Sequence, residues 1–397
     1  MRKPLKDIVV LDVTQYWAGP CCSMILADMG AEVIKVEPPE GGDGVRGWSM
    51  PGSKGESPHY LPVNRNKKSI LLNLKLPKAK EIFLELAKQA DIVLENFRPG
   101  VVKKLGIDYD AVKKVKPAII YCSISGFGQT GPYSSQAAFD VVLQALGGLM
   151  SVTGEEGGRP VKPGAPQADI FGAMNAAMTI LGMLIEREKT GEGGYLDIAL
   201  LDTQILLMGY HILTYLFSGQ IPKPMGTKHP LLTPYESFQT KDIEIIIGVA
   251  TEKHWVKLCE ILDKKELATD ERFYNSSQRI KNREELYPII DKITLTKPSE
   301  YWLNALKESG IPCAAINTVD KLLEDPQVTH RKMIIEIENQ AFGKVKVPGI
   351  PWKLGPISEE ESPVPPPLLG QHTMEILSGR LGYSKEHVNK LKEEGVI

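Results

Sequence analysis

The stretch DIVVLDVTQYWAGPCCSMILADMGAEVIKVE, residues 7–37, decides which fold is expected for this chain. Its β-branched start predicts a buried strand at 7–11, and its end, AEVIKVE, predicts a second strand. Between them lies a small and apolar segment in which Pro20 suits the first turn of a helix and Gly30 suits its end. A strand–helix–strand unit of this kind predicts two parallel strands.

The same alternation continues through the first half of the chain. KKSILLNL, DIVLENF and AIIYCSIS predict strands, and PKAKEIFLELAKQA and YDAVKKVKP predict helices. We therefore predict an α/β fold with an open, doubly wound, mostly parallel, Rossmann-like sheet. A buried apolar helix is expected at 170–189, followed by the strand YLDIAL and a second apolar helix.

The character of the sequence changes near Ile221, where Pro and Thr become frequent and a hairpin-like pair of strands follows. We expect a smaller α+β domain here, and a return of the chain to the large domain after it. The predicted divisions are the N-terminal part of the large domain at 1–205, a linker helix at 206–224, the small domain at 225–325 and a return segment at 326–397.

Composition limits the classes of partner. The 397 residues are 42% hydrophobic and 24% charged, with a formal net charge of −2, so nothing in the overall charge attracts nucleic acid or an anionic membrane. The longest uncharged apolar stretch, 170–185, is shorter than the roughly 20 residues of a membrane span, and no signal peptide is expected. The five cysteines and seven histidines lack metal-ligand spacing, which favours no metal site, reduced thiols and a cytoplasmic location.

The segment SISGFGQTGP contains Gly126, Gly128 and Gly131 in the spacing of a dinucleotide fingerprint. The fingerprint also needs a helix directly after the glycines and an acid about 20 residues on, but the sequence reads as a loop and Asp140 is too close. At the first strand–helix–strand unit Glu37 is well placed, yet the turn WAGP has only one glycine. We therefore do not expect NAD or FAD, and interpret the glycines as a loop that lets the backbone approach a ligand.

Asp169 is a single charged residue directly before the long apolar helix. One interpretation is an N-cap, which accepts hydrogen bonds from the first helical N–H groups. The other is a nucleophile toward an activated carbonyl, kept ionised by the helix dipole and surrounded by small residues that leave room for a ligand.

Six ordered segments are similar to the family III CoA-transferases, which include formyl-CoA:oxalate and crotonobetainyl-CoA:carnitine transferases. They are VLDVTQYWAGP…LADMGAEVIKVEPPEGGD, NRNKKSILLNLK, ENFRPGVVKKLG, SISGFGQTGPYSSQAAFD, ADIFGAM…REKTGEGGYLDIALLD and PPPLLGQHT. The resemblance implies that Asp169 is the nucleophile of an acyl-CoA:carboxylate CoA-transferase, acting through an aspartyl anhydride and an aspartyl-CoA thioester. It also implies CoA and acyl-CoA as substrates, no tightly bound cofactor, and an interlocked ring-like homodimer.

The resemblance further implies which residues contact CoA. By position these are Trp17, Ala18, Leu72, Asn73, Leu74, Lys75, Asn96, Phe97, Arg98, Lys104, Gln136, Ala137, Ala138 and Phe139. Two departures matter, because Pro38 and Ala137 stand where oxalate-type members commonly have a basic residue. We expect the phosphate contacts to be redistributed, with Arg65, Lys67 and Lys68 as candidates.

Two alternatives remain. The α-methylacyl-CoA racemases share the fold but pair the aspartate with a histidine, and this chain has Phe139 at that place, which disfavours racemisation. A non-catalytic CoA-binding protein is the other alternative. The short stretch IIIGVATEKHW has no glycine cluster, and Trp17 occupies a position that is polar in oxalate-type members, so we expect an acceptor larger or less polar than oxalate.

Overall fold

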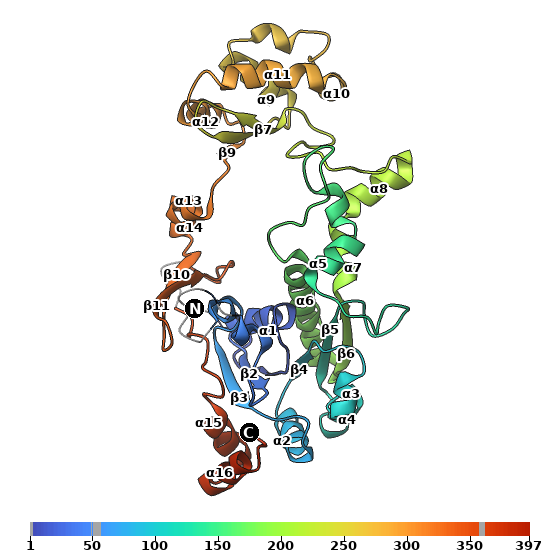
Figure 1. Ribbon diagram of the computed structural model, residues 1–397, viewed down its shortest axis with the longest axis vertical. Helices are drawn as coiled ribbons and strands as arrows, with labels where there is room; N and C mark the ends of the chain where they lie inside the picture. The colour runs from blue at the N-terminus through green and yellow to red at the C-terminus, as the bar shows by residue number, and fades with distance from the viewer. Residues whose placement is uncertain (1–2, 49, 51–56, 357–361) are drawn as a thin grey trace. The chain divides into compact units, whose positions relative to one another are not determined.

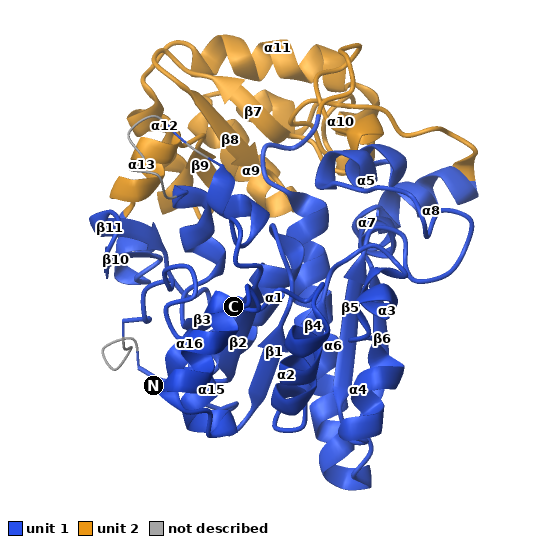
Figure 2. Cartoon of the chain, turned by 60° about the horizontal axis from the view of Figure 1, so that its bottom comes forward, with its two compact units in different colours: residues 1–149, 162–217, 326–397 blue, residues 150–161, 218–325 orange. Residues whose placement is uncertain are grey.

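The structure is a computed structural model, and it describes residues 3–48, 50, 57–356 and 362–397. The chain divides into two units, coloured separately in Figure 2. Unit 1 comprises Met1–Leu149, Lys162–Phe217 and Pro326–Ile397, and unit 2 comprises Met150–Val161 and Ser218–Asp325. The segment Met150–Val161, expected in the large domain, thus belongs to unit 2.

Unit 1 is built on a six-stranded sheet in which every neighbouring pair is parallel, as predicted (Figure 1). The strand order is β3-β2-β1-β4-β5-β6, so the direction of winding reverses between β1 and β4. In sheets of this type a ligand binds beyond the carboxyl ends of the strands at that point. The strands are β1 (Val9–Asp12), β2 (Glu32–Glu37), β3 (Lys67–Leu71), β4 (Ile92–Glu95), β5 (Ile120–Ser125) and β6 (Gly194–Ala199).

Helices cover both faces of this sheet. Successive strand residues point to opposite faces, so Val10 belongs to a core shared with helices α1 and α6 while Leu11 belongs to one shared with α2, α15 and α16. The helices of unit 1 are α1 (Ala18–Asp28), η1 (Gly44–Gly47), η2 (Pro58–Val63), α2 (Pro77–Ala87), α3 (Val101–Leu105), α4 (Tyr109–Val115), α5 (Asp140–Leu146), α6 (Gln167–Thr190), α7 (Leu200–Leu207), α8 (Gly209–Ser218), α14 (Pro326–His330), α15 (Thr373–Leu381) and α16 (Lys385–Glu393).

Helix α6 is longer than the uncharged stretch that predicted it. By length and composition it could cross a membrane, a test that the core helix of a soluble protein also passes. One side of α6, including Ala173, Ala177 and Ile180, is buried in the core shared with α1 and the sheet. Burial in unit 1 therefore accounts for the apolar residues on this side of the helix.

The prediction of a single second apolar helix is wrong, because the segment forms two helices. The chain forms α7 and α8, which are bent by 62° at Met208. The predicted linker helix 206–224 also fails beyond Ser218, because the left-handed Gly219 (φ +69°) follows it. Glycine lowers helix propensity, and the two glycines Gly209 and Gly219 lie at the points where these helices begin or end.

Unit 2 contains the predicted hairpin, joined by a third strand into an antiparallel sheet. Its elements are β7 (Tyr235–Gln239), β8 (Glu244–Gly248), α9 (Glu252–Ile261), η4 (Lys265–Ala268), α10 (Ser276–Lys281), α11 (Arg283–Thr294), α12 (Ser299–Glu308), β9 (Cys313–Ala315) and α13 (Val319–Glu324). The short helix η3 (Leu149–Val152) lies at the boundary between the units. The return segment adds an antiparallel pair to unit 1, β10 (Ile334–Asn339) with β11 (Gly343–Pro348).

Candidate active site

A cavity of about 670 Å³ opens where the strands of unit 1 end, at what we call the carboxyl edge of the sheet. Loops that follow β1, β2, β3 and β4 all contribute to it, which places it at the reversal of strand order. Its lining residues are Val13, Gln15, Val36, Pro38, Pro39, Glu40, Leu72, Asn73, Leu74, Lys75, Phe97, Leu105 and Gly395.

Five of the residues expected to contact CoA line this cavity: Leu72, Asn73, Leu74, Lys75 and Phe97. Arg98 and Lys104 lie close by in sequence, in the loop after β4 and in α3, and both are exposed. Within the described part of the chain, the side chains of Lys75, Arg98 and Lys104 form no ion pair. Cations without an acidic partner beside a cavity are available to phosphate groups.

The other expected CoA residues lie around the same edge but outside the cavity lining. Trp17 is half-buried at the N-cap position of α1, and Ala18 is buried as the first residue of that helix. The Asn96 side chain is bonded to the backbone of Gln15. Gln136, Ala137, Ala138 and Phe139 form the end of the loop between β5 and α5, where all but the half-buried Ala138 are exposed.

The glycine loop follows β5, and no helix begins until Asp140, so the predicted failure of the dinucleotide fingerprint is confirmed. Gly126 has a packing role, because a Cβ atom there would lie 2.2 Å from the Cβ of Ala138. Gly128 and Gly131 have φ angles of +82° and +91°, which favour glycine. The glycines therefore shape the loop that carries Ala138 and Phe139.

Glu37, the other acid considered as a ribose ligand of a dinucleotide, already forms hydrogen bonds within the protein. It is 1% exposed, and its carboxylate accepts hydrogen bonds from Arg46 Nε (2.8 Å) and Nη2 (3.0 Å) and from Ser69 Oγ (2.5 Å). Burial alone would raise the pKa of Glu37, but the Arg46 guanidinium brings it below its usual value. Glu37 thus stabilises the carboxyl edge from within.

Asp169 is the third residue of α6, whose N-cap position is Pro166, so the N-cap interpretation of Asp169 is wrong. The carboxylate that does bind this helix end comes from elsewhere, because Asp140 Oδ1 accepts the Ala168 N–H at 2.9 Å. Asp169 itself is half-buried and has no hydrogen-bond partner among the described residues. Its carboxylate is consequently free to react.

The helix N–H groups that were expected to keep Asp169 ionised form no hydrogen bond with it among the described residues. Burial, together with the negative charge of Asp140, raises the pKa of Asp169 to about 7. A carboxylate that is poorly solvated is a stronger nucleophile than one that is stabilised by several hydrogen bonds. Burial likewise raises the pKa of the nearby Cys21 thiol to about 11, which disfavours a cysteine nucleophile at this place.

An aromatic cluster borders this region and joins four separate segments of unit 1. The ring of Tyr16 lies 6.2 Å from that of Trp48 and 6.3 Å from that of Phe139, and Trp48 lies 6.1 Å from the ring of His59. Tyr16, Trp48 and Phe139 are 41%, 47% and 63% exposed. Phe139 directly precedes Asp140, whose carboxylate accepts the N–H of Ala168, so the cluster is linked to the first turn of α6. The sequence analysis missed Tyr16, Trp48 and His59, which carry no local signal.

The expected redistribution of phosphate contacts to Arg65, Lys67 and Lys68 is wrong. Arg65 and Lys67 are each 2% exposed and pair with Asp28 (2.6 Å) and Asp12 (3.4 Å). Lys68 pairs with Glu32 and Glu375 at 3.1 and 2.8 Å. These cations neutralise carboxylates of their own chain.

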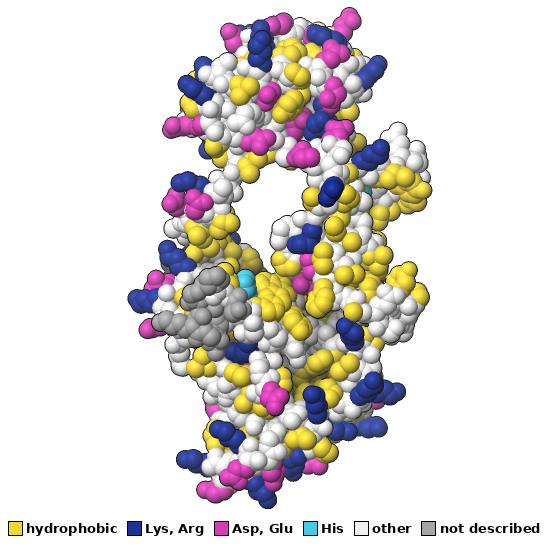
Figure 3. Space-filling view, viewed as in Figure 1, with side chains coloured by type: hydrophobic (Ala, Val, Ile, Leu, Met, Phe, Trp, Pro, Cys, Tyr) yellow, Lys and Arg dark blue, Asp and Glu magenta, His cyan; other side chains and the backbone are white. Residues whose placement is uncertain are grey.

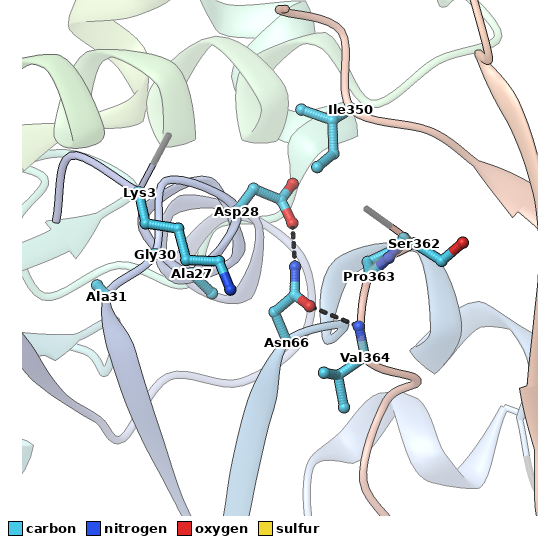
Figure 4. Close-up of a pocket in the computed structure, with 10 residues that line it drawn as sticks. All are labelled: Lys3, Ala27, Asp28, Gly30, Ala31, Asn66, Ile350, Ser362, Pro363 and Val364. Carbon is cyan, nitrogen blue, oxygen red and sulfur yellow. Dashed lines mark hydrogen bonds between the residues drawn. The ribbon is translucent and has the colours of Figure 1, made fainter. Parts of the chain in front are cut away.

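A smaller cavity of about 220 Å³ lies at the opposite edge of the sheet, which we call the amino edge (Figure 4). Here Asn66 donates to Asp28 Oδ1 and accepts from the Val364 N–H, both at 2.7 Å. Asp28 also receives three hydrogen bonds from Arg65. The lining residues are Lys3, Ala27, Asp28, Gly30, Ala31, Asn66, Ile350, Ser362, Pro363 and Val364. Mutual pairing of these groups favours a structural role.

Comparison with known proteins agrees with this geometry. Residues 5–373 match CoA-transferase family III. The chain is 40% identical over 395 residues to the succinyl-CoA:glutarate CoA-transferase of Homo sapiens, covering 100% of this chain and 90% of that protein. It is 37% identical over 387 residues to the succinate–glutarate CoA-transferase of Agrobacterium fabrum, covering 95% of this chain and 96% of that protein. A crystal structure of a CAIB/BAIF family protein from Brucella suis is similar at a TM-score of 0.84 and 34% identity, covering 96% of this chain and all of that one.

The chain therefore belongs to CoA-transferase family III. It is an acyl-CoA:carboxylate CoA-transferase, an enzyme that moves CoA from an acyl-CoA to a carboxylic acid.

Proposed function

We propose that Asp169 is the nucleophile of this transfer and that the cavity at the carboxyl edge holds the nucleotide end of CoA. The observation that carries the proposal is the state of Asp169, a half-buried carboxylate at a helix start without a hydrogen-bond partner among the described residues. Lys75, Arg98 and Lys104, which lack acidic partners, lie at the same edge and can neutralise phosphate groups.

The proposed reaction is a relay between carboxylates. The Asp169 carboxylate attacks the thioester carbon of the donor, the C–S bond breaks, and an aspartyl anhydride and CoA thiolate result. The thiolate attacks the aspartyl carbonyl, which releases the donor acid and leaves an aspartyl-CoA thioester. The acceptor carboxylate then attacks this thioester, and the same two steps in reverse yield the new acyl-CoA and free Asp169.

The position of Asp169 suits this relay because its environment favours a reactive anion. Its pKa of about 7 leaves much of the group ionised at neutral pH, while few neighbours stabilise the charge. Asp140 holds the first turn of α6 and at the same time keeps a negative charge near the reacting group. We expect no proton transfer at carbon, because the family position of a racemase histidine is occupied by Phe139.

We propose dicarboxylic acids of the size of succinate and glutarate as the exchanged acids. The two relatives described above are named for succinate or succinyl-CoA and glutarate. The methylene chain of such an acid fits an apolar surface like that of Tyr16, Trp48 and Phe139. His59 is the one member of the aromatic cluster that can carry a positive charge, and it can pair with the distal carboxylate.

We also propose a homodimer of interlocked rings, formed through an apolar face of unit 1. Outward-facing side chains of α6, α7 and α8 are exposed well beyond what is common for large apolar residues, and Figure 3 shows hydrophobic side chains gathered over α7 and α8. Met178, Leu206, Leu216 and Phe217 are 64%, 68%, 67% and 88% exposed. A partner would bury this surface.

A cytoplasmic location is likewise our proposal, from cysteine spacing.

The test is to trap the acyl-enzyme. Protein mixed with succinyl-CoA is treated with hydroxylamine and its peptides are analysed by mass spectrometry, with Asp169→Ala as the matched control. We expect a hydroxamate on Asp169 in the wild-type protein and none on the variant. A hydroxamate on another carboxylate during turnover, or full exchange activity in Asp169→Ala, would refute the assignment. A protein that binds succinyl-CoA without any exchange would be the non-catalytic binder.

A further inference from the structure

Two loops meet at the carboxyl edge, one after β1 and one after β4. The strands are parallel neighbours, and the pairing continues to Val13, whose N–H donates to the Leu94 carbonyl at 2.9 Å. Gln15 and Phe97, one from each loop, both line the cavity of about 670 Å³. The relative position of the two loops therefore sets the shape of that cavity.

The side chain of Asn96 joins these loops beyond the end of the backbone pairing. Asn96 Oδ1 accepts the Gln15 N–H at 2.8 Å, and Asn96 Nδ2 donates to the Gln15 carbonyl at 2.7 Å. An amide side chain that bonds both polar groups of one residue replaces a peptide unit of the missing strand. Asn96 does not belong to the cavity lining, although the family resemblance places it among the CoA contacts.

Other bonds hold the loop after β1 from its opposite side. Tyr16 has a left-handed backbone (φ +68°), which is unfavourable for a bulky residue, and its N–H donates to Asp43 Oδ1 at 2.9 Å. Lys35, which is fully buried, pairs with Asp43 at 2.9 Å and donates to the Thr14 carbonyl at 2.7 Å. The conformation at Tyr16 is thus imposed by contacts on both sides of the loop.

A continuous set of contacts leads from this loop to Asp169. The Tyr16 ring meets the Phe139 ring edge-on, at 6.3 Å and 86°. Phe139 precedes Asp140, whose carboxylate holds the N–H of Ala168, and Asp169 is the next residue. Displacement of the loop at Gln15 would therefore be felt at the nucleophile.

We propose that Asn96 is a positioning residue that ties the CoA cavity to the site of Asp169, a role that rests on the function proposed above. Asn96 acts through Gln15 and Tyr16 and need not touch CoA. Its two hydrogen bonds keep the loop after β1 in the conformation in which the acyl group meets Asp169. Loss of either bond lowers the rate of acyl transfer even for a donor that has no nucleotide.

The experiment compares two donors, succinyl-CoA and succinyl-pantetheine, which lacks the nucleotide. The measured quantity is the rate of Asp169 acylation at saturating donor, together with the concentration at half saturation. Asn73→Ala is the matched control, because Asn73 lines the cavity itself and bonds the C-terminal segment at Gly395 instead of the Gln15 loop. We expect Asn96→Ala to slow acylation by both donors, by about tenfold or more for a displacement on the order of 1 Å. Asn73→Ala should raise the concentration at half saturation for succinyl-CoA and leave that for succinyl-pantetheine unchanged.

A second variant protects the test against misfolding. Asn96→Asp has the same shape and keeps an acceptor for the Gln15 N–H, but its second oxygen replaces the donor and repels the Gln15 carbonyl, so we expect a loss of rate with both donors. Melting temperatures identify any variant that fails to fold, in which case the other variant decides. Slower acylation of Asp169 by both donors supports the proposal. The proposal is overturned if the only change is a higher concentration of succinyl-CoA at half saturation, or if neither quantity changes. Failure of the wild-type protein to acylate Asp169 would instead overturn the proposed function.

Discussion

The two edges of the parallel sheet differ in whether their charged side chains have partners. At the amino edge the Asp28 carboxylate accepts a hydrogen bond from Asn66, which Figure 4 shows, and others from Arg65, so that both of its oxygens are bonded. At the carboxyl edge Lys75 and Asp169 have no charged or hydrogen-bonding partner for their side chains within the described residues. Removing one member of a buried pair destabilises the fold, whereas groups left unpaired at the end of parallel strands are available for a ligand.

The presence or absence of a partner separates structural from functional charges more reliably than a perturbed pKa does. Lys67 is a cation near the site in sequence, but it lies buried against Asp12, Asn64 and the Pro20 carbonyl. Burial lowers the pKa of Lys67 to about 8, although Asp12 opposes the shift. A perturbed pKa alone would have suggested a functional lysine here. Its partners show that it joins the end of β1 to the first turn of α1.

The largest effect is expected from Asp169, the proposed nucleophile. Asp169→Asn removes the attacking carboxylate but keeps its size, so we expect kcat for CoA exchange to fall by about 10⁴-fold or more. The exchange of labelled succinate into succinyl-CoA measures it. Binding of CoA by the variant, measured by calorimetry, should be unchanged, because the nucleotide site is separate. A variant with more than a tenth of wild-type exchange would contradict the proposed relay.

The next effect concerns the amino edge. Asp28→Ala leaves the 2% exposed Arg65 without its acid, and we expect the free energy of unfolding to fall by about 3–5 kcal/mol. Urea denaturation measures this loss, and exchange activity of the folded protein at low temperature should remain near that of the wild type. If activity fell sharply while stability stayed the same, the amino edge would have a functional role and the contrast between the edges would disappear.

A smaller effect is expected for the cations at the carboxyl edge. Lys75→Ala and Arg98→Ala should each raise KM for acyl-CoA by about tenfold, with little change in kcat, and the effect should shrink as salt is added. Lys68→Ala is the matched control, because the Lys68 side chain is partly exposed but already pairs with Glu32 and Glu375. If Lys68→Ala and Lys75→Ala raised KM equally, the presence of an ion pair would not predict which lysine binds the phosphates of CoA.

The smallest effect is a shift in pH dependence. Protonated Asp169 cannot attack, so kcat should rise with pH through about 7 and be lost on the acid side. Asp140→Asn removes a negative charge that raises the pKa of Asp169, so the rise should move to lower pH. The pH profile of kcat for both proteins tests this. An unchanged or alkaline-shifted profile in Asp140→Asn would argue against coupling between the two carboxylates.

Much of the fold was predictable because it depends on local patterns. β-Branched runs bounded by turn residues located the strands of the parallel sheet, an amphipathic pattern located α2, and a long apolar stretch located α6. The break between α7 and α8 was missed because both halves are apolar and only Gly209 marks the joint. A single glycine is compatible with either a continuous or a bent helix, and packing decides between them.

Less of the site was predictable. The resemblance pointed to Asp169, to the four residues Leu72–Lys75 and to Phe97, and the last five of these line a cavity. The carboxylate of Asp140, which binds the N–H of Ala168, comes from 28 positions away, and Asn96 reaches Gln15 across 81. No spacing rule relates residues so far apart, since the fold alone brings them together.

Primary structure was sufficient for the parallel α/β architecture and for an acid at the start of a long apolar helix, because both follow from propensity and periodicity over short stretches. Tertiary structure alone decided which charges neutralise each other and which remain free. That outcome depends on desolvation and on distances of a few ångströms between residues from distant strands and loops. For this reason Arg65 is paired with Asp28, while Lys75 and Asp169 have no such partner among the described residues and are our candidates for binding and catalysis.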